Sequence, residues 1–379
     1  FPVCIFKHVL NALMGLAFNT CLCYETMIQI ASPQIGKEER EAVDRVLRSG
    51  IIAQGPEVAK FEEEFARICG VKYAVAACNG TTAGHLVMLA SGIGPGDEVI
   101  TTPFTFFATA SVVMMTGAKP VFVDVEKDGF CLDPSKVEAA ITNKTKAIHP
   151  VHLYGELADV PSLLKIAERN NLLLIEDSAQ AHCANSWNGN AGSFGKAGWF
   201  SFYPTKNMTT SEGGIITTND EDLANKCKII RAHGMSAQYQ HTEFGYNYRM
   251  TDISAAIGRE QLKKLPRFNA RRREIAQKYN SELSDFVITP KNRRGHVFHQ
   301  YTIRSKKRDE LREFLLDRKI NTGIYYPSLL YSYPSMREYQ SSCPNAETLV
   351  QEVLSLPIHP ALSNSDVFEV ISNIKSFFS

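Results

Sequence analysis

The stretch LLLIEDSAQ, residues 172–180, decides the fold class of this chain. A short aliphatic run without alternation is typical of a strand buried on both faces, as in a parallel sheet covered by helices. The run ends in Glu176 and Asp177. Because α/β proteins bind their ligands at the carboxyl ends of such strands, we expect a site here.

Strand and helix patterns alternate around this stretch. The apolar runs Tyr73–Cys78 and Lys146–Gly155 indicate further strands, and a helix near Val160–Asn170 leads back to the acid-ended strand. This βαβ rhythm is typical of a doubly wound sheet. The sequence therefore predicts an α/β fold with two parts. A large domain, residues 27–266, contains a mostly parallel sheet covered by helices on both faces, and a smaller C-terminal α+β domain comprises residues 267–379.

Composition narrows the functional class. The chain has 379 residues, of which 44% are hydrophobic and 21% charged, as in ordinary globular proteins. A formal net charge of +1 without a long basic run disfavours nucleic acid or an anionic membrane as a partner. The nine cysteines include no CxxC pair, so we expect neither a metal site nor a disulfide framework, and a reducing cytoplasm fits.

Residues 1–26 differ in character from the rest. Lys7 followed by an apolar run at residues 9–18 is a weak signal-peptide pattern, but no small-residue cleavage site follows. The apolar part is also too short to span a bilayer. We interpret residues 1–26 as an extension outside the functional chain.

The stretch SFYPTKNMTTSEGG, residues 201–214, contains the candidate reactive amine. Lys206 lies there among small polar residues and glycines; an exposed loop lysine is the alternative interpretation. A strand-end aspartate and a later loop lysine suit pyridoxal 5'-phosphate, whose aldehyde needs an amine and whose ring nitrogen needs an acid. We therefore predict Lys206 and Asp177 as the catalytic pair, because an anionic carboxylate keeps that ring nitrogen protonated.

A second polar segment follows the strand at Tyr73–Cys78. Asn79, Gly80, Thr81 and Thr82 open a helix there. A helix N-terminus offers unpaired N–H groups to an anion, and glycine allows close backbone approach. The segment therefore predicts a phosphate site, with an ordinary capped helix as the alternative.

Several motifs, in order, resemble those of the DegT-type nucleotide-sugar aminotransferases, which are fold type I pyridoxal phosphate enzymes. They are IEDSAQAH, GSFGKAGWFSFYPTKN, SEGGIITTND, RAHG, GYNYRMTD and VLSLPIHP, and the similarity runs from about Met27 to the C-terminus. Independent motifs in one order are far more specific than a single short one. The resemblance implies pyridoxal 5'-phosphate as the cofactor, with pyridoxamine phosphate as its second form.

The resemblance also assigns residues that bind the cofactor. It implies that Gly80, Thr81 and Ser201 hold the phosphate, and that Gln180 reaches the phenolic oxygen. An aromatic ring lies on the pyridine ring in this family, and Phe106 matches that position. Phe106 could instead belong to the core, as its neighbours Phe104 and Phe107 could.

Two further segments complete the implied site. Tyr325 and Tyr326 match a family segment beside the substrate, although Tyr331 stands where a histidine is usual. Asn247 and Arg249 match a segment that closes the phosphate site of a neighbouring subunit, which implies a homodimer with shared sites. An ion pair of Arg249 with an acid on its own surface is the alternative.

The function implied is transfer of an amino group, with glutamate the usual donor, to a keto nucleotide-sugar for amino-sugar or cell-surface polysaccharide synthesis. The turn Glu212-Gly213-Gly214 is commoner in members acting at C4 than at C3, which favours C4. A related sugar dehydratase has histidine in place of the lysine, so Lys206 argues against it. A regulatory protein that binds the cofactor without turnover is disfavoured by Lys206, Asp177 and Gln180 together.

Overall fold

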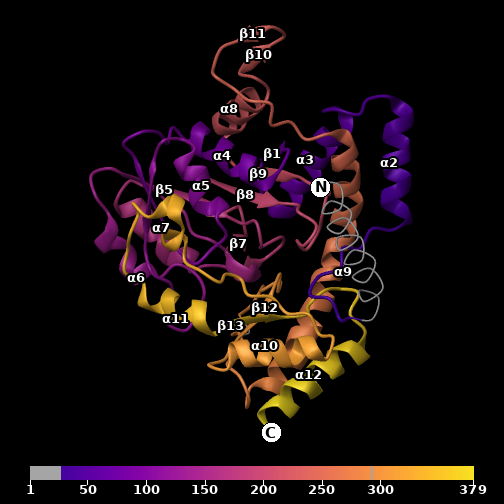
Figure 1. The fold of residues 1–379 in the computed structure, drawn as a ribbon. Helices are drawn as coiled ribbons and strands as arrows, with labels where there is room; N and C mark the ends of the chain where they lie inside the picture. Colours follow the sequence, from indigo (N-terminus) through magenta and orange to yellow (C-terminus); the bar gives the residue numbers. More distant parts are fainter. Residues whose placement is uncertain (1–26, 292) are drawn as a thin grey trace, which may run out of the picture.

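The structure is a computed structural model that describes residues 27–291 and 293–379 (Figure 1). The expected extension, residues 1–26, lies outside the described residues. A seven-stranded sheet forms the centre of the described part. Its strands, in spatial order, are β1 (Tyr73–Ala77), β9 (Gly214–Thr218), β8 (Ala197–Ser201), β5 (Leu173–Asp177), β4 (Thr145–Ile148), β2 (Glu98–Thr101) and β3 (Lys119–Phe122).

The expected mostly parallel sheet is confirmed. Strand β9 pairs antiparallel with both β1 and β8, whereas the pairs from β8 through β5, β4 and β2 to β3 are parallel. One strand is shorter than expected: β4 ends at Ile148, because Pro150 has no N–H to continue the ladder. The chain then rejoins the sheet only at an isolated bridge between Val151 and Asp177.

Helices cover both faces of the sheet, as predicted (Figure 1). Side chains along β1 point alternately to the two faces of the sheet, and both sets are apolar and need cover. Val75 and Ala77 pack in one core cluster, and Ala74 and Ala76 pack in another. The first face is covered by α4 (Gly80–Ala90), α5 (Ala108–Met114) and α8 (Glu221–Arg231). The second face is covered by α3 (Pro56–Cys69), the first half of α9 (Asp252–Leu283), α7 (Val160–Arg169) and α11 (Pro344–Glu352).

The C-terminal region forms a second core below the sheet in Figure 1. Its strands β12 (Tyr301–Arg304) and β13 (Val353–Leu356) pair antiparallel. The helices α10 (Arg308–Asp317) and α12 (Asn364–Phe378) pack beside them. Near the start of the described chain, Ile28 forms a parallel bridge with Ile320, so this region includes an early segment of the chain.

The long helix α9 connects the two cores. It continues through Pro266, so the division expected at residue 266 falls inside one helix. Its Ala255 and Leu265 pack in a core of the main sheet, and its Ile275 and Tyr279 pack in the C-terminal core. The two halves of α9 thus hold the two cores at a fixed spacing.

The remaining elements are short or peripheral. They are α2 (Lys37–Ser49), α6 (Pro134–Val137), the hairpin of β6 (Asn185–Ser186) and β7 (Gly189–Asn190), and the hairpin of β10 (Met235–Ala237) and β11 (Gln240–His241). The β10–β11 hairpin projects away from the body of the molecule (Figure 1). No helix in the described ranges is both long enough and apolar enough to cross a membrane.

Candidate active site

A cavity of about 460 Å³ lies at the carboxyl ends of β5 and β8 and extends to the C-terminal region. It brings together nine of the eleven residues singled out from the sequence, which is notable because they are spread over 247 positions, from residue 80 to residue 326. They are Gly80, Thr81, Phe106, Asp177, Gln180, Ser201, Lys206, Tyr325 and Tyr326.

Lys206 lies in the turn that follows β8. Its backbone N–H donates to the carbonyl of Tyr203 at 2.9 Å, which holds the turn and places the side chain at the cavity. Burial disfavours the ammonium form and lowers the pKa of Lys206 to about 8, although the charge of Asp177 opposes this. The amine is therefore much easier to deprotonate than an ordinary lysine.

Asp177, the last residue of β5, is buried and held by two donors. The hydroxyl of Thr109 donates to one carboxylate oxygen at 2.7 Å, and the N–H of Ala179 donates to the other at 3.1 Å. Burial raises the pKa of Asp177, while His149, Thr109 and Lys206 act in the opposite direction. The sequence reasoning missed Thr109, because its position on α5 carries no local motif.

The N-terminus of α4 faces the same cavity. The Asn79 side chain accepts the N–H of Thr82 at 2.8 Å, which leaves the N–H groups of Gly80 and Thr81 without an acceptor among the described residues. A Cβ at Gly80 would lie 2.6 Å from the Cβ of Ser201. Glycine is needed there because the helix start approaches the end of β8 so closely.

Three side chains form the floor and side of the cavity. Phe106 is 56% exposed, whereas Phe104 is fully buried in the core. The structure thus distinguishes Phe106, whose ring faces the cavity, from Phe104, which is a core residue. The ring of Phe106 lies 6.0 Å from that of Tyr326. Gln180 donates to the Tyr326 hydroxyl at 3.0 Å and accepts the N–H of Tyr154 at 2.8 Å, so its amide is fixed in one orientation.

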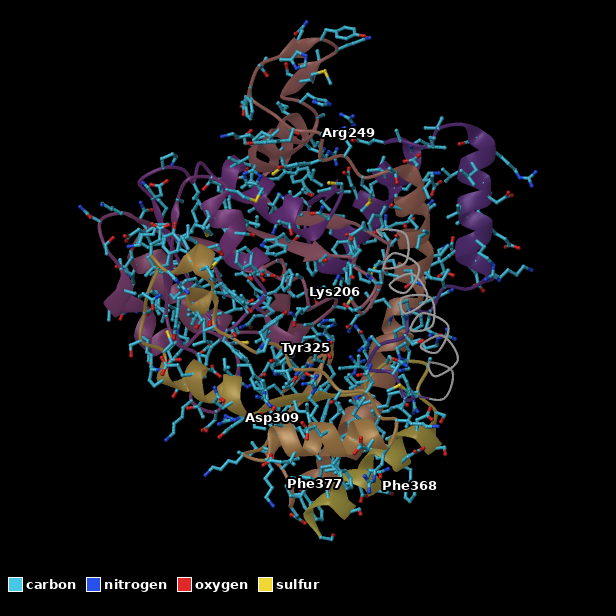
Figure 2. The ribbon with its side chains drawn as sticks, in the orientation of Figure 1. Lys206, Arg249, Asp309, Tyr325, Phe368 and Phe377 are labelled. Carbon is cyan, nitrogen blue, oxygen red and sulfur yellow. The ribbon has the colours of Figure 1, made fainter. Side chains whose placement is uncertain are left out.

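The other two of the eleven, Asn247 and Arg249, lie outside the cavity lining, and so does Tyr331. Tyr331 is buried against Phe122, and its hydroxyl donates to Glu347 at 3.2 Å, so the contact made by the usual histidine is not available to it. Asn247 is exposed, and Arg249 lies well apart from Lys206, toward the β10–β11 side (Figure 2). Among the described residues, Arg249 forms no ion pair.

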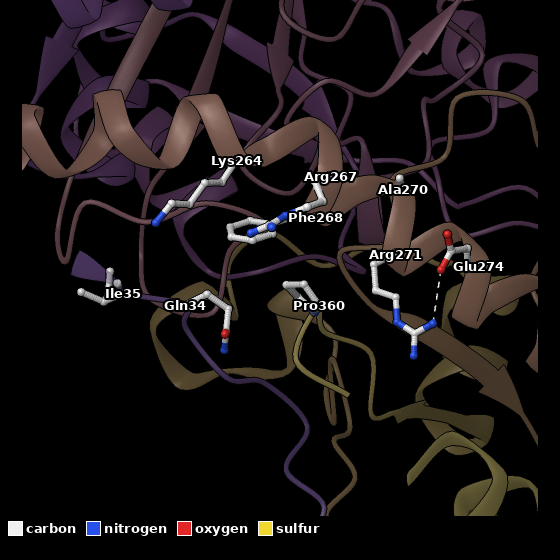
Figure 3. A pocket seen from close by; sticks show the side chains of 10 residues that line it. Gln34, Ile35, Lys264, Arg267, Phe268, Ala270, Arg271, Glu274 and Pro360 are labelled. Atoms are coloured by element: carbon white, nitrogen blue, oxygen red, sulfur yellow. Dashed lines mark hydrogen bonds and ion pairs between the residues drawn. The ribbon is translucent and has the colours of Figure 1, made fainter. Parts of the chain in front are cut away.

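A larger hollow of about 600 Å³ lies along α9, between Lys264 and Glu274 (Figure 3). Its charged groups are mostly paired: Lys264 bonds to Glu39 at 2.7 Å, and Arg271 lies 3.2 Å from Glu274. It contains no pair of reactive amine and buried acid. The smaller cavity is therefore the better candidate for an active site, because of the residues that line it and despite its smaller volume.

The C-terminal region contributes two residues that the sequence reasoning passed over. His299 and Gln300, just before β12, are buried and line the cavity. The signal in the sequence was a polar pair directly before an apolar strand, in HQYTIRS. It was too weak to separate from an ordinary strand start.

The residues that line the cavity suit pyridoxal phosphate. Free N–H groups at a helix start suit a phosphate, a buried carboxylate suits a ring nitrogen, and a lysine with a lowered pKa suits an aldehyde. A mostly parallel sheet with this lysine and this acid at its strand ends defines the fold type I class of pyridoxal phosphate-dependent enzymes. Comparison with known proteins agrees and is more specific.

Residues 33–375 match the model of the DegT/DnrJ/EryC1/StrS aminotransferase family, and the chain belongs to this family. It is 44% identical to a pleiotropic regulatory protein of Geobacillus stearothermophilus, over 91% of this chain and 95% of that protein. It is 39% identical to the GDP-perosamine synthase of Escherichia coli O157:H7, over 93% and 99% of the two chains.

A solved structure extends the comparison to three dimensions. The Bacillus subtilis protein NtdA, solved with bound cofactor PMP, superimposes with a TM-score of 0.86 at 30% identity, over 91% of this chain and 83% of that one. The expected fold class and family are thus confirmed. The chain is a member of a family of pyridoxal phosphate-dependent sugar aminotransferases.

Proposed function

We propose that this protein uses pyridoxal phosphate to move an amino group from glutamate to C4 of a keto nucleotide-sugar. The observation that carries the proposal is the meeting of the Lys206 amine and the Asp177 carboxylate in one cavity with the free N-terminus of α4. The similarity to a GDP-perosamine synthase supports a nucleotide-sugar as the acceptor.

Each part of the cavity wall has a distinct task in holding the cofactor. Gly80, Thr81 and Ser201 would bind the phosphate, and Asp177 would face the ring nitrogen. Phe106 would cover one face of the ring, since its side chain is otherwise exposed in the cavity. When bound, the cofactor supplies an aldehyde for amines and a ring that accepts electrons.

Lys206 would act as both covalent anchor and proton carrier. With the pKa of Lys206 near 8, about a quarter of the protein molecules have a neutral Lys206 amine at pH 7.5. For an ordinary lysine this fraction is about a thousandth. The neutral amine is the form that can bond to an aldehyde. When the Lys206 amine is not bonded to the cofactor, it would take a proton from one atom of the substrate and return that proton to another atom.

Asp177 would keep its negative charge throughout. The two donors on its carboxylate, Thr109 and Ala179, favour the ionised form in a place where burial opposes it. A carboxylate held in this way can stabilise a protonated ring nitrogen without moving. Gln180 would be a fixed donor beside the cofactor, because its own orientation is set by Tyr154.

The position of the ketone rests on Glu212, which lines the cavity. One methylene distinguishes its reach from that of the aspartate more usual in enzymes acting at C3, and such differences are worth about 1–3 kcal/mol. The test supplies the cofactor-loaded protein with glutamate and matched 3-keto and 4-keto nucleotide-sugars. We expect higher kcat/KM with the 4-keto sugar; a preference for the 3-keto sugar would reject C4 and keep amino transfer.

We further propose a homodimer with shared sites. Asn247 and Arg249 follow the projecting β10–β11 hairpin and lie away from the cavity of their own chain, as expected of residues that serve a partner. Lys206→Ala chains mixed with Asn247→Ala/Arg249→Ala chains should regain activity, since each heterodimer contains one intact site. Verified heterodimers that stay inactive would contradict shared sites.

A regulatory role is the second candidate, and the name of the Geobacillus relative favours it. The same assay separates the two functions. Turnover with any keto nucleotide-sugar supports the enzyme. Cofactor binding without turnover, across a panel of sugars and amino donors, would favour the regulator.

A further inference from the structure

A chain of side-chain hydrogen bonds runs behind Lys206. Asn269, on α9, donates to the carbonyl of His182 at 2.9 Å and accepts from the Asn207 amide at 2.8 Å. The Asn207 amide also donates to the carbonyl of Val297 at 3.0 Å, and its oxygen lies 3.3 Å from Nδ1 of His299. The three side chains of this hydrogen-bond chain, Asn269, Asn207 and His299, are all buried.

The direction of this chain is fixed by two backbone carbonyls. A carbonyl can only accept, so the carbonyl of His182 must face the NH₂ of Asn269, and the carbonyl of Val297 must face the NH₂ of Asn207. Flipping either amide would put two oxygens together. The oxygen of Asn207 therefore points at His299.

This direction determines the tautomer of His299. Because the Asn207 oxygen accepts, Nδ1 of His299 must carry the proton, and Nε2 of the neutral ring is then an acceptor. No hydrogen bond among the described residues involves Nε2, and His299 lines the same cavity as Lys206. The cavity lining thus includes both an acceptor nitrogen and the reactive amine.

The charges around the ring keep it neutral. Burial lowers the pKa of His299 well below its ordinary value, and Lys206, Arg272 and His182 lower it further. Burial lowers the pKa of Lys206 to about 8, and the charge of Asp177 opposes this. A neutral acceptor suits this position, because an imidazolium would repel the ammonium form of Lys206.

We propose that Nε2 of His299 accepts a hydrogen bond from the free amine of Lys206 and positions that amine for proton transfer. This rests on the role of Lys206 proposed above. His299 is thus a positioning residue, and Asn207 and Asn269 set its tautomer. An acceptor cannot bind a carboxylate, so the carboxylates of the amino donor must be held elsewhere in the cavity.

The first test measures the pKa of Lys206 in His299→Phe by competitive labelling with acetic anhydride and peptide mapping. Loss of an acceptor for the ammonium form should lower this pKa by about one to two units. The matched control is His182→Phe, since His182 is buried nearby and neither of its ring nitrogens lies within hydrogen-bond geometry of a partner among the described residues. This control should shift the pKa by less than about 0.3 units.

Two outcomes of this test overturn the proposal. One is an unchanged Lys206 pKa in a folded His299→Phe protein, with folding checked by circular dichroism. The other is an equal shift in His299→Phe and His182→Phe, which would indicate a general effect of removing a buried imidazole.

The second test needs no substitution. ¹⁵N chemical shifts of labelled histidine should give His299 as the neutral Nδ1–H tautomer from pH 6 to 8. Detection of the Nε2–H tautomer or of a charged ring would overturn the proposal. Neither test needs cofactor or sugar, so a failure of amino transfer can be told apart from a failure of this inference.

Discussion

The cavity has two walls that are held in different ways. The sheet-side wall is made by Gly80, Asp177, Ser201 and Lys206. Asp177 and Ser201 are held by the strand ladder, Gly80 starts α4, and Lys206 is held by the turn after β8. The C-terminal wall, made by His299, Gln300, Tyr325 and Tyr326, comes from loop segments around β12 and after α10.

Cross-contacts between side chains join the two walls. Gln180 bonds to Tyr326, Tyr154 bonds to the carbonyl of Tyr325, and Asn207 bonds to His299. Bonds of this kind can adapt to a substrate, whereas ladder bonds cannot. We therefore expect the sheet-side wall to carry the covalent chemistry, and Tyr325 and Tyr326 of the C-terminal wall to adjust the fit of the substrate.

The largest effect is expected from a substitution in the sheet-side wall. Lys206→Ala should reduce kcat/KM by at least about 10³-fold, because it removes the covalent anchor and the proton carrier together. Steady-state kinetics and the visible absorbance of the cofactor-loaded protein would measure this. A folded variant with a tenth of normal activity would mean that another group carries the proton.

Asp177→Asn should lower kcat by roughly 10- to 100-fold, since it replaces a charged hydrogen-bond partner by a neutral one. The cofactor should still bind, because the phosphate site is unchanged. The measurement is turnover at saturating substrate, with cofactor content as the control. Wild-type kcat would contradict the proposed role of the charge.

A subtler change in the same wall is Thr109→Val, which keeps the shape and removes one donor to Asp177. Burial already raises the pKa of Asp177 and Thr109 opposes it, so the variant should raise that pKa further. Activity needs the ionised form, which is lost as pH falls. The acid limb of the pH–kcat profile should therefore move upward, and an unmoved limb would reject the coupling.

The smallest effect is expected from the C-terminal wall. Tyr326→Phe removes the hydroxyl that accepts from Gln180, which should raise the KM for the sugar by about 2- to 10-fold with little change in kcat. Kinetics with varied sugar concentration would measure this. A loss in kcat as large as that of Asp177→Asn would erase the proposed distinction between the walls.

Sequence alone led to the sheet-side wall because its residues sit in short motifs. Asp177 ends an apolar run, and Lys206 lies between two others, so local patterns revealed both. In the C-terminal wall, Tyr325 and Tyr326 came from the family resemblance, whereas His299, Gln300 and the separate Thr109 depend on contacts between distant positions. The bond between Asn207 and His299 joins residues 92 positions apart, and no pattern within one segment reports it.

Element boundaries show the same limit. Within the segment NAETLVQEVL, residues 345–354, the helix ends at Glu352 and β13 begins at Val353, and no glycine or proline marks the change. Val353 has a high strand propensity, and Leu354 has no strong preference for strands. Pairing with β12 therefore decides that these two residues form a strand. That partner lies some fifty positions earlier, so local propensity could not reveal the change.

The bridge between Ile28 and Ile320 has a consequence for synthesis of the chain. At about 5–20 residues per second, a ribosome would make residue 320 roughly 15 to 60 seconds after residue 28. Through that interval the early segment has no partner, and the C-terminal core cannot close. The sheet can form first, and the newborn protein would gain its second cavity wall only when synthesis is nearly finished.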